Sequence, residues 1–182
     1  AGLNGIGAVY CAIEQYDKAL VSLLQSEKIN LELNTKESLK NVLDSIAETY
    51  LNLNDYTKAL EYYSKCFELS KELQSKQTEA YALNGLGNTY AALKEYEKAE
   101  LYFNKCLEIR RETSFKFGEA VTLNNLGNLF LKQNDIKKAI QLLKQSYDIS
   151  VQVRSKEGIY QSSEKLAELY EKEGEISESR HY

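Results

Sequence analysis

Apolar, small and aromatic residues recur along this chain at intervals of 40 residues. Within one interval, Leu83, Leu86, Gly87 and Tyr90 follow the i, i+3, i+4, i+7 spacing of a single helix face. The same step relates a column of small residues, which are Gly7, Ala47, Gly87, Gly127 and Ala167. It also relates an aromatic column, which is Tyr10, Tyr50, Tyr90, Phe130 and Tyr170. No insertion interrupts the register, so the pattern predicts a series of equivalent helical units.

Each unit is predicted to be a helical hairpin. In the third unit the first helix, helix A, is expected at about 77–93 and the second, helix B, at about 96–113. Turns are expected at Lys94-Glu95 and at the matching Asn54-Asp55 and Asn134-Asp135, where the aspartates are suited to capping helix B. A lone hairpin cannot bury its apolar face, whereas stacked hairpins form one continuous core. The predicted fold is therefore all-α, a solenoid of stacked antiparallel helix pairs.

The register also predicts the organisation of the chain. We expect a single array over 1–182, with units at approximately 1–34 (with a partial first helix), 35–74, 75–114, 115–154 and 155–182 (truncated). The array begins and ends inside a unit and contains no methionine. These features predict a fragment of a longer protein.

Small residues are expected where the two helices of a hairpin cross. Glycine or alanine in the Gly87 column, and alanine in a second column, would let helices A and B approach closely. The second column is Ala19, Ala59, Ala99 and Ala139, each preceded by a lysine. Cys66 and Cys106 share a column with Ser26 and Ser146, which indicates packing positions rather than redox groups.

These residues resemble the signature of the tetratricopeptide repeat family. The resemblance rests on Leu83-Asn84-Gly85-Leu86-Gly87-Asn88-Thr89-Tyr90 and Tyr96-Glu97-Lys98-Ala99, and it extends over essentially the whole chain. Leucine stands where the family usually has tryptophan, the proline that usually closes helix B is absent, and the period exceeds the common length of about 34 residues. The longer period resembles Pins-type spindle-orientation adaptors and, more loosely, kinesin light chains and bacterial Rap-type regulators.

The resemblance implies a right-handed superhelix in which helices A line a concave, peptide-binding groove. The residues expected in that groove are Asn84, Asn88, Asn124, Asn128, Asn4, Asp44, Glu48, Asn52, Tyr81, Lys132, Glu164 and Glu168. An asparagine amide carries both a donor and an acceptor, so the first four could pair with the backbone of an extended ligand. The alternative is that these asparagines bond to neighbouring helices and only orient the stack.

Charge narrows the class of partner. The formal net charge of −4 provides no basic footprint for nucleic acid, and no apolar run is long enough for a membrane helix. The acidic pairs Asp44/Glu48 and Glu164/Glu168 either favour a ligand with basic ends or form a solvated face. The groove columns that contain them carry no lysine or arginine, which argues against a carboxylate-clamp type of tetratricopeptide domain. An odd number of cysteines and the absence of Asn-x-Ser/Thr favour a cytoplasmic location.

No catalytic chemistry is predicted. Gly5-Ile6-Gly7 lacks the strand and the third glycine of a dinucleotide loop, and the sole histidine, His181, lies at the chain end. We therefore expect no enzyme activity, no cofactor and no metal. The predicted function is a non-catalytic protein-interaction scaffold that binds an extended or helical peptide in the concave groove. The partner is a protein or peptide, and self-association through uncapped ends is also open. The alternative is a regulatory or sensor input module of a larger signalling protein, such as a histidine kinase, a response regulator or a transcription factor.

Overall fold

The computed structural model of the chain describes residues 2–173, and every regular element among them is an α-helix. This confirms the all-α fold class. The helices are α1 (Leu3–Ala12), α2 (Tyr16–Glu32), α3 (Lys36–Asn52), α4 (Tyr56–Glu72), α5 (Lys76–Ala92), α6 (Tyr96–Glu112), α7 (Lys116–Lys132), α8 (Ile136–Gln152) and α9 (Lys156–Glu173). Helices A of the repeat are odd-numbered and helices B are even-numbered. His181 and the segment expected to start a last helix B lie outside the described residues.

The 40-residue period is the length of two equal helices and two equal turns. Each helix from α2 to α8 has 17 residues, and each turn has three. In every turn one residue that is not glycine adopts a left-handed backbone, for example Asn54 with φ 60°. Asn54 N–H donates to Leu51 O at 3.0 Å and Asp55 N–H donates to Tyr50 O at 2.9 Å, the pattern of a Schellman motif.

The residue after each left-handed position immediately precedes the next helix. Asp55 and Asp135 accept hydrogen bonds from the backbone N–H groups of Lys58 and Lys138 at 3.2 and 3.1 Å, which confirms them as N-caps. Ser75 accepts in the same way from Thr78 N–H at 3.3 Å. One turn therefore both ends a helix and caps the following one without proline.

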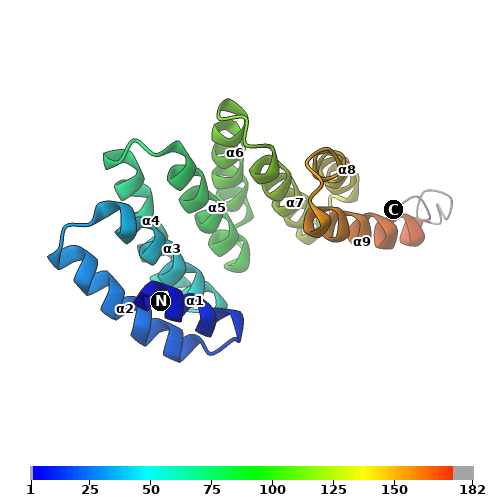
Figure 1. Cartoon of the computed structure of the whole chain (residues 1–182). Helices are drawn as coiled ribbons and strands as arrows, with labels where there is room; N and C mark the ends of the chain where they lie inside the picture. Colours follow the sequence, from blue (N-terminus) through cyan, green and yellow to red (C-terminus); the bar gives the residue numbers. More distant parts are fainter. Residues whose placement is uncertain (1, 174–182) are drawn as a thin grey trace. The chain divides into compact units, whose positions relative to one another are not determined.

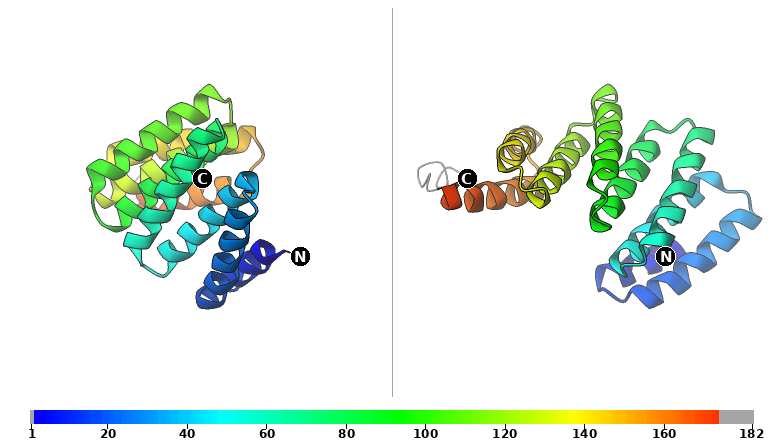
Figure 2. Two further views of the ribbon diagram at one scale, coloured as in Figure 1. Left: turned by 90° about the vertical axis from the view of Figure 1, so that its left-hand side faces the viewer. Right: turned by 180° about the vertical axis from the view of Figure 1, so that it is seen from behind.

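The chain divides into two compact units, residues 1–95 (unit 1) and 96–182 (unit 2). Consecutive helices pack against each other within each unit, as α1 to α5 in unit 1 and α6 to α9 in unit 2. The odd-numbered helices also contact in turn, α1 with α3, α3 with α5, and α7 with α9. Figures 1 and 2 show these hairpins from three sides. The division into 40-residue repeat units stays a prediction.

Small residues permit the close crossings within hairpins. A Cβ added to Gly7 would come 2.6 Å from Leu23 Cγ, and one added to Gly127 would come 2.7 Å from Leu143 Cγ. The residues of the second small column, Ala19, Ala59, Ala99 and Ala139, are fully buried. The structure thus confirms the expected role of the small columns, because a larger side chain would displace the leucine opposite.

The lysines that precede Ala19, Ala59 and Ala139 lie over aromatic rings. Lys58 Nζ is 4.9 Å from the ring centre of Tyr50, and Lys138 Nζ is 3.7 Å from that of Phe130. These are cation–π distances, so the repeated lysine fixes the crossing of a hairpin. Cys66 and Cys106 are fully buried, which agrees with packing positions.

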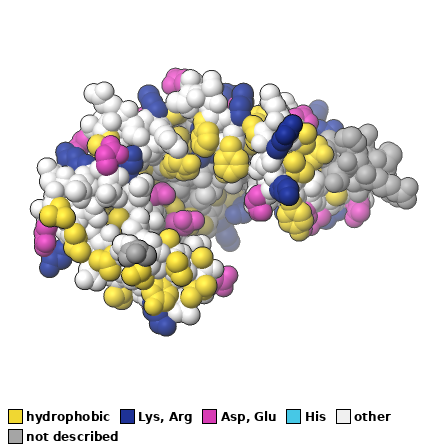
Figure 3. All heavy atoms as spheres, in the orientation of Figure 1, with side chains coloured by type: hydrophobic (Ala, Val, Ile, Leu, Met, Phe, Trp, Pro, Cys, Tyr) yellow, Lys and Arg dark blue, Asp and Glu magenta, His cyan; other side chains and the backbone are white. Residues whose placement is uncertain are grey.

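The outer face of α1 lacks a covering helix among the described residues. Ile6 is 39% and Val9 is 61% exposed, whereas Ile46 and Thr49, their counterparts in α3, are fully buried. Hydrophobic side chains accordingly gather at the surface beside the N-terminus in Figure 3. The self-association that the sequence left open stays a prediction.

Candidate functional site

All the residues expected to contact a ligand lie on odd-numbered helices. Unit 1 contains seven of them, which are Asn4, Asp44, Glu48, Asn52, Tyr81, Asn84 and Asn88. Unit 2 contains the other five, which are Asn124, Asn128, Lys132, Glu164 and Glu168. Because the asparagine quartet is shared between the units, a four-residue ladder stays a prediction.

Burial separates these residues into two groups. Asp44 and the asparagines of α1, α5 and α7 are half-buried, while Glu48, Asn52, Tyr81, Lys132, Glu164 and Glu168 are exposed. The half-buried group is positioned by packing, since it flanks the buried apolar stripe of each helix A. The exposed group is accessible at the surface.

Unit 2 contains a small pocket between α7 and α9, with α8 behind it. Its volume is about 150 Å³, several times the roughly 30 Å³ of one water molecule. The residues that line it are Phe117, Ala120, Val121, Asn124, Ser146, Ser150, Ser155, Glu157, Gly158 and Gln161. A Cβ on Gly158 would overlap the Ser150 hydroxyl, so glycine is what allows α9 to approach α8 here.

Two polar atoms at this pocket are buried without a hydrogen bond from any described residue. They are Asn124 Oδ1 and Ser150 Oγ. The neighbouring Ser146 hydroxyl, in contrast, donates to Ala120 O at 2.8 Å. A buried polar atom with no partner costs about 1–3 kcal/mol, so such atoms call for a functional explanation. Asn124 Oδ1 can accept an N–H donor from a ligand.

Asn4 in unit 1 also has a buried side-chain oxygen without a hydrogen bond from the residues that the structure describes. It stands at the same repeat position as Asn124, and its Oδ1 is likewise buried without a hydrogen-bond partner among residues 2–173. The recurrence at one position of two different helices favours a shared role for this column.

Unit 1 places a carboxylate at the corresponding position of α3. Burial, and then the charge of Glu48, raise the pKa of Asp44 from 3.8 to about 6. Burial, and then the charge of Asp44, raise the pKa of Cys66 to about 12. The Tyr63 pKa is raised by burial and then by the same two carboxylates. This acidic, partly buried cluster on α3 and α4 would favour a cationic group.

The acidic pair of α9 is partly neutralised. The Tyr160 hydroxyl donates to Glu164 Oε1 at 3.0 Å, and Lys165 Nζ lies 3.0 Å from Glu168 Oε2. The hydrogen bond to Glu164 raises the Tyr160 pKa. Asp44 and Glu48 are therefore the stronger acidic feature of this face.

Sequence reasoning missed Ser150 and Gly158. The available signal was a further small column, Ser38, Thr78, Gly118 and Gly158, at the same 40-residue step. Sequence reasoning also left two glutamates, Glu79 and Glu119, unmentioned, and both are buried. Nothing in their local pattern distinguishes them from the exposed glutamates nearby.

The described residues contain no cluster of His, Cys, Asp or Glu that could bind a metal ion. Among the same residues, no helix is both long and apolar enough to cross a membrane.

The fold resembles several solved structures at low sequence identity. BtubC (BKLC) from P. vanneervenii matches with a TM-score of 0.81 and 19% identity, over 98% of this chain and 74% of that one. A Rap protein complexed with Competence and Sporulation Factor matches with a TM-score of 0.83 and 17% identity, over 98% of this chain and 50% of that one. A putative kinesin light chain from Podosopora anserina has nearly identical TPR-like repeats; it gives a TM-score of 0.73 and 17% identity over 98% and 88% of the two chains.

None of the curated proteins is close enough in sequence to count as a match. The model of the tetratricopeptide repeat family matches residues 1–72, 37–112 and 78–150. These matches together span most of the chain, and they agree with the helical hairpins and with the solved structures. The chain therefore belongs to the tetratricopeptide repeat family.

Proposed function

We propose that this chain is a protein-interaction module that binds a peptide segment along its odd-numbered helices. Membership of the tetratricopeptide repeat family supports an interaction or regulatory sensor module in general. The observation that carries the finer proposal is the buried, unpartnered Oδ1 of Asn124 at the α7–α9 pocket. A peptide N–H would supply the missing donor and offset the cost of burying that oxygen.

Each unit by itself offers contacts to a peptide. In unit 2, Asn124 and Ser150 would pair with a backbone amide or a short polar side chain of the peptide. In unit 1, Asp44 and Glu48 would attract a lysine or arginine of the peptide. The ligand we propose is therefore an extended segment with at least one basic residue, and binding involves no reaction.

The test begins with peptides selected from a display library on the wild-type chain. A selected peptide is titrated against wild type, Asn124→Leu and Asn104→Leu, with helicity checked by circular dichroism. Asn104 is an exposed asparagine of α6 in the same unit, so it is the matched control. We expect Asn124→Leu to weaken binding about tenfold, close to 1.4 kcal/mol, and Asn104→Leu to leave it unchanged. Equal binding by all three proteins would show that the asparagine is structural.

A second candidate function is the sensor input of a longer signalling protein. The Rap structure supports it, because that protein is complexed with Competence and Sporulation Factor and is about twice the length of the matched region. The test is to identify the full-length protein and measure whether the selected peptide changes the activity of any additional domain. An interaction scaffold alone would show binding with no such change.

A further inference from the structure

A second surface, on the even-numbered helices, has the properties of a docking groove. It lies in unit 1 between α2 and α4, which both pack on α3, and its volume is about 790 Å³. We name it the α2–α4 groove; its lining residues from α3 are Lys36, Leu39 and Leu43. None of the residues of the candidate site described above lines it. The inference below therefore does not rest on the proposed peptide site.

The centre of the groove is apolar. Leu39, Leu43 and Leu69 form its floor and are nearly buried, while Leu31 on α2 is 59% exposed beside them. An exposed leucine alone is ordinary, but here it adjoins three further leucines in a cavity. The volume lies within the range of about 300–1,000 Å³ that is typical of ligand pockets.

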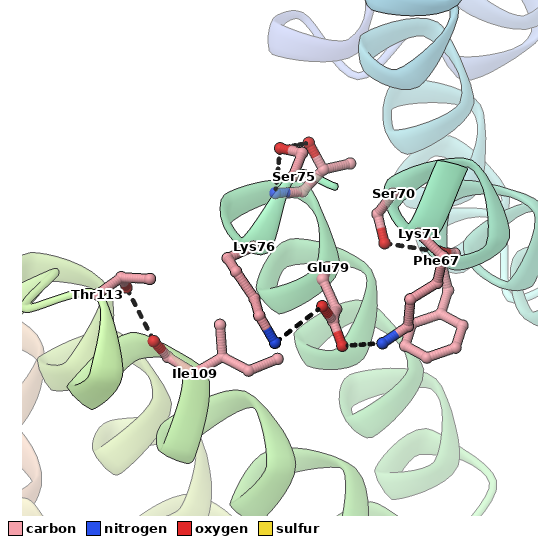
Figure 4. Close-up of polar contacts among 9 residues, drawn as sticks. Phe67, Ser70, Lys71, Ser75, Lys76, Glu79, Ile109 and Thr113 are labelled. Atoms are coloured by element: carbon pink, nitrogen blue, oxygen red, sulfur yellow. Dashed lines mark hydrogen bonds and ion pairs between the residues drawn. The ribbon is translucent and has the colours of Figure 1, made fainter. Parts of the chain in front are cut away.

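At two of the other three joints between a helix B and the next helix A, the equivalent positions contain an ion-pair cluster instead. Forty residues after Leu31 and Leu39 stand Lys71 and Glu79, whose side chains form an ion pair. Lys76 Nζ also lies 3.6 Å from Glu79 Oε2. Figure 4 shows the Glu79 carboxylate between the two ammonium groups.

Unit 2 repeats this cluster. Arg111 Nε and Lys116 Nζ each lie 2.8 Å from the carboxylate of the buried Glu119. Two of the four such joints among the described helices are therefore ionic, whereas the joint between α8 and α9 has Val151 and Ile159 at these positions. The joint between α2 and α3 is also apolar, because two leucines stand in place of the cation and the anion. Its remaining lysine, Lys36, pairs with Glu72 at 2.8 Å instead.

The rim of the groove is acidic. Its glutamates are Glu27, Glu61, Glu68 and Glu72, against two lysines, Lys36 and Lys65. Each lysine forms an ion pair with one of these glutamates, Lys65 with Glu61 at 2.6 Å and Lys36 with Glu72. Glu27 accepts a hydrogen bond from the neutral hydroxyl of Tyr62 at 3.2 Å. Among the described residues, no cation pairs with Glu27 or with Glu68. The rim therefore carries uncompensated negative charge.

We propose that the α2–α4 groove docks an amphipathic helix of a partner protein, with aliphatic residues on one face and lysine or arginine beside them. The apolar floor between two helices fits the helix-in-groove mode of recognition, in which anchors recur at i, i+3, i+4 and i+7. The uncompensated glutamates select a basic helix over an acidic one.

The test uses three synthetic peptides of about 14 residues and fluorescence anisotropy. The first has leucine at i, i+3, i+4 and i+7 flanked by lysines; the second has glutamates in place of the lysines; the third is a scrambled form of the first. We expect the first to bind at least about tenfold more tightly than the other two. Binding of the acidic or scrambled peptide as tightly as the basic one would overturn the proposal.

The decisive variant is the double substitution Leu31→Lys with Leu39→Glu. It installs in the first joint the ion pair that this chain already forms at Lys71 and Glu79, with Lys36 in the place of Lys76. The variant should therefore fold, and the basic peptide should lose its binding. Glu68→Lys, at an exposed rim position, serves as a second variant and should weaken the basic peptide while leaving the fold untouched. Unchanged binding by both variants would contradict the proposal.

The same proteins test for two other possible occupants of the groove. Dimerisation of the wild-type chain that disappears in the Leu31→Lys, Leu39→Glu variant, measured by light scattering, would assign the groove to a second copy of this chain. Binding of a medium-chain fatty acid without binding of the basic peptide would assign it to a small apolar ligand. The peptide selected for the proposed function should bind wild type and the double variant equally, which separates the failure of one proposal from the failure of the other.

Discussion

Helix α3 of unit 1 and helix α7 of unit 2 place different side chains at one repeat position while the backbone around it stays the same. In α3 the position holds Asp44, whose pKa is raised to about 6 by burial and by Glu48. In α7 it holds Asn124, whose Oδ1 is buried without a partner in the described part of the chain. Both helices have 17 residues and begin 80 positions apart in the same register.

The surroundings differ in the same way. The position that Gly158 occupies beside Asn124 is occupied in unit 1 by Thr78, whose hydroxyl is 2.9 Å from that of Ser75. Glycine allows the close helix approach behind the pocket of unit 2, whereas threonine fills the same position in unit 1. The repeat therefore determines the backbone of the helices. A few side chains determine whether the surface at one repeat position carries a carboxylate or borders a neutral pocket.

The largest effect is expected where the residue of one unit is placed in the other. Gly85 in α5 corresponds to Asn125 in α7, but a Cβ on Gly85 would overlap the buried ring of Tyr63. Gly85→Asn should therefore lower the free energy of unfolding by about 3 kcal/mol, measured by urea denaturation followed by circular dichroism. Gly5→Asn, at the exposed counterpart in α1, should cost much less. Equal losses would show that the close approach to Tyr63 is unimportant.

Exchanging the two polar residues sharpens the comparison. Asp44→Asn should raise the free energy of unfolding by about 2 kcal/mol at pH 7, because the folded chain holds a carboxylate whose pKa is above its unfolded value. The stabilising effect of protonated Asp44 is fully present below about pH 4 and is lost as the pH rises through about 6. The benefit of the substitution should thus vanish near pH 4.

The reciprocal substitution, Asn124→Asp, should lower the free energy of unfolding by about 1–3 kcal/mol at pH 7, because it buries a charge at the pocket of unit 2. A pH titration of both variants by thermal denaturation checks the pair. A benefit of Asp44→Asn that is independent of pH would refute the raised pKa.

The helix caps should contribute equally in the two units. Asp55→Ala and Asp135→Ala each remove a side-chain acceptor from a helix N-terminus. Each should cost about 1 kcal/mol, and Asn should restore most of it. Urea denaturation of the four single variants measures this, and a loss confined to one unit would mean that the two turns are not equivalent.

The smallest expected effect concerns the lysines over the aromatic column. Lys138→Gln should cost about 0.5–1 kcal/mol, and Lys58→Gln should cost less, since its ammonium lies 4.9 Å rather than 3.7 Å from the ring centre. Lys137→Gln, an exposed neighbour, is the control. Identical stability of all three variants would show that the cation–π contacts do not stabilise the fold.

The sequence by itself determined the helices, their register and the columns of the core. The helices expected at about 77–93 and 96–113 are α5 and α6, each displaced by no more than one residue. The spacing also predicted the capping aspartates, the small residues at the helix crossings and the buried cysteine column. These features depend on contacts that recur every 20 or 40 residues, so the local pattern contains the information.

Only the tertiary structure decided which polar residues have unusual environments. Asn84 and Asn124 look alike in sequence, yet Asn124 Oδ1 lies unpartnered at a pocket whose wall is completed by α9. Leu31 and Leu39 read as ordinary members of an amphipathic stripe, and the groove beside them exists because α4 supplies its opposite wall. Glu79 is buried because Lys71 and Lys76 converge on it from two helices. In each case the environment is formed by side chains from a neighbouring helix, and no spacing within a single helix specifies which residues those are.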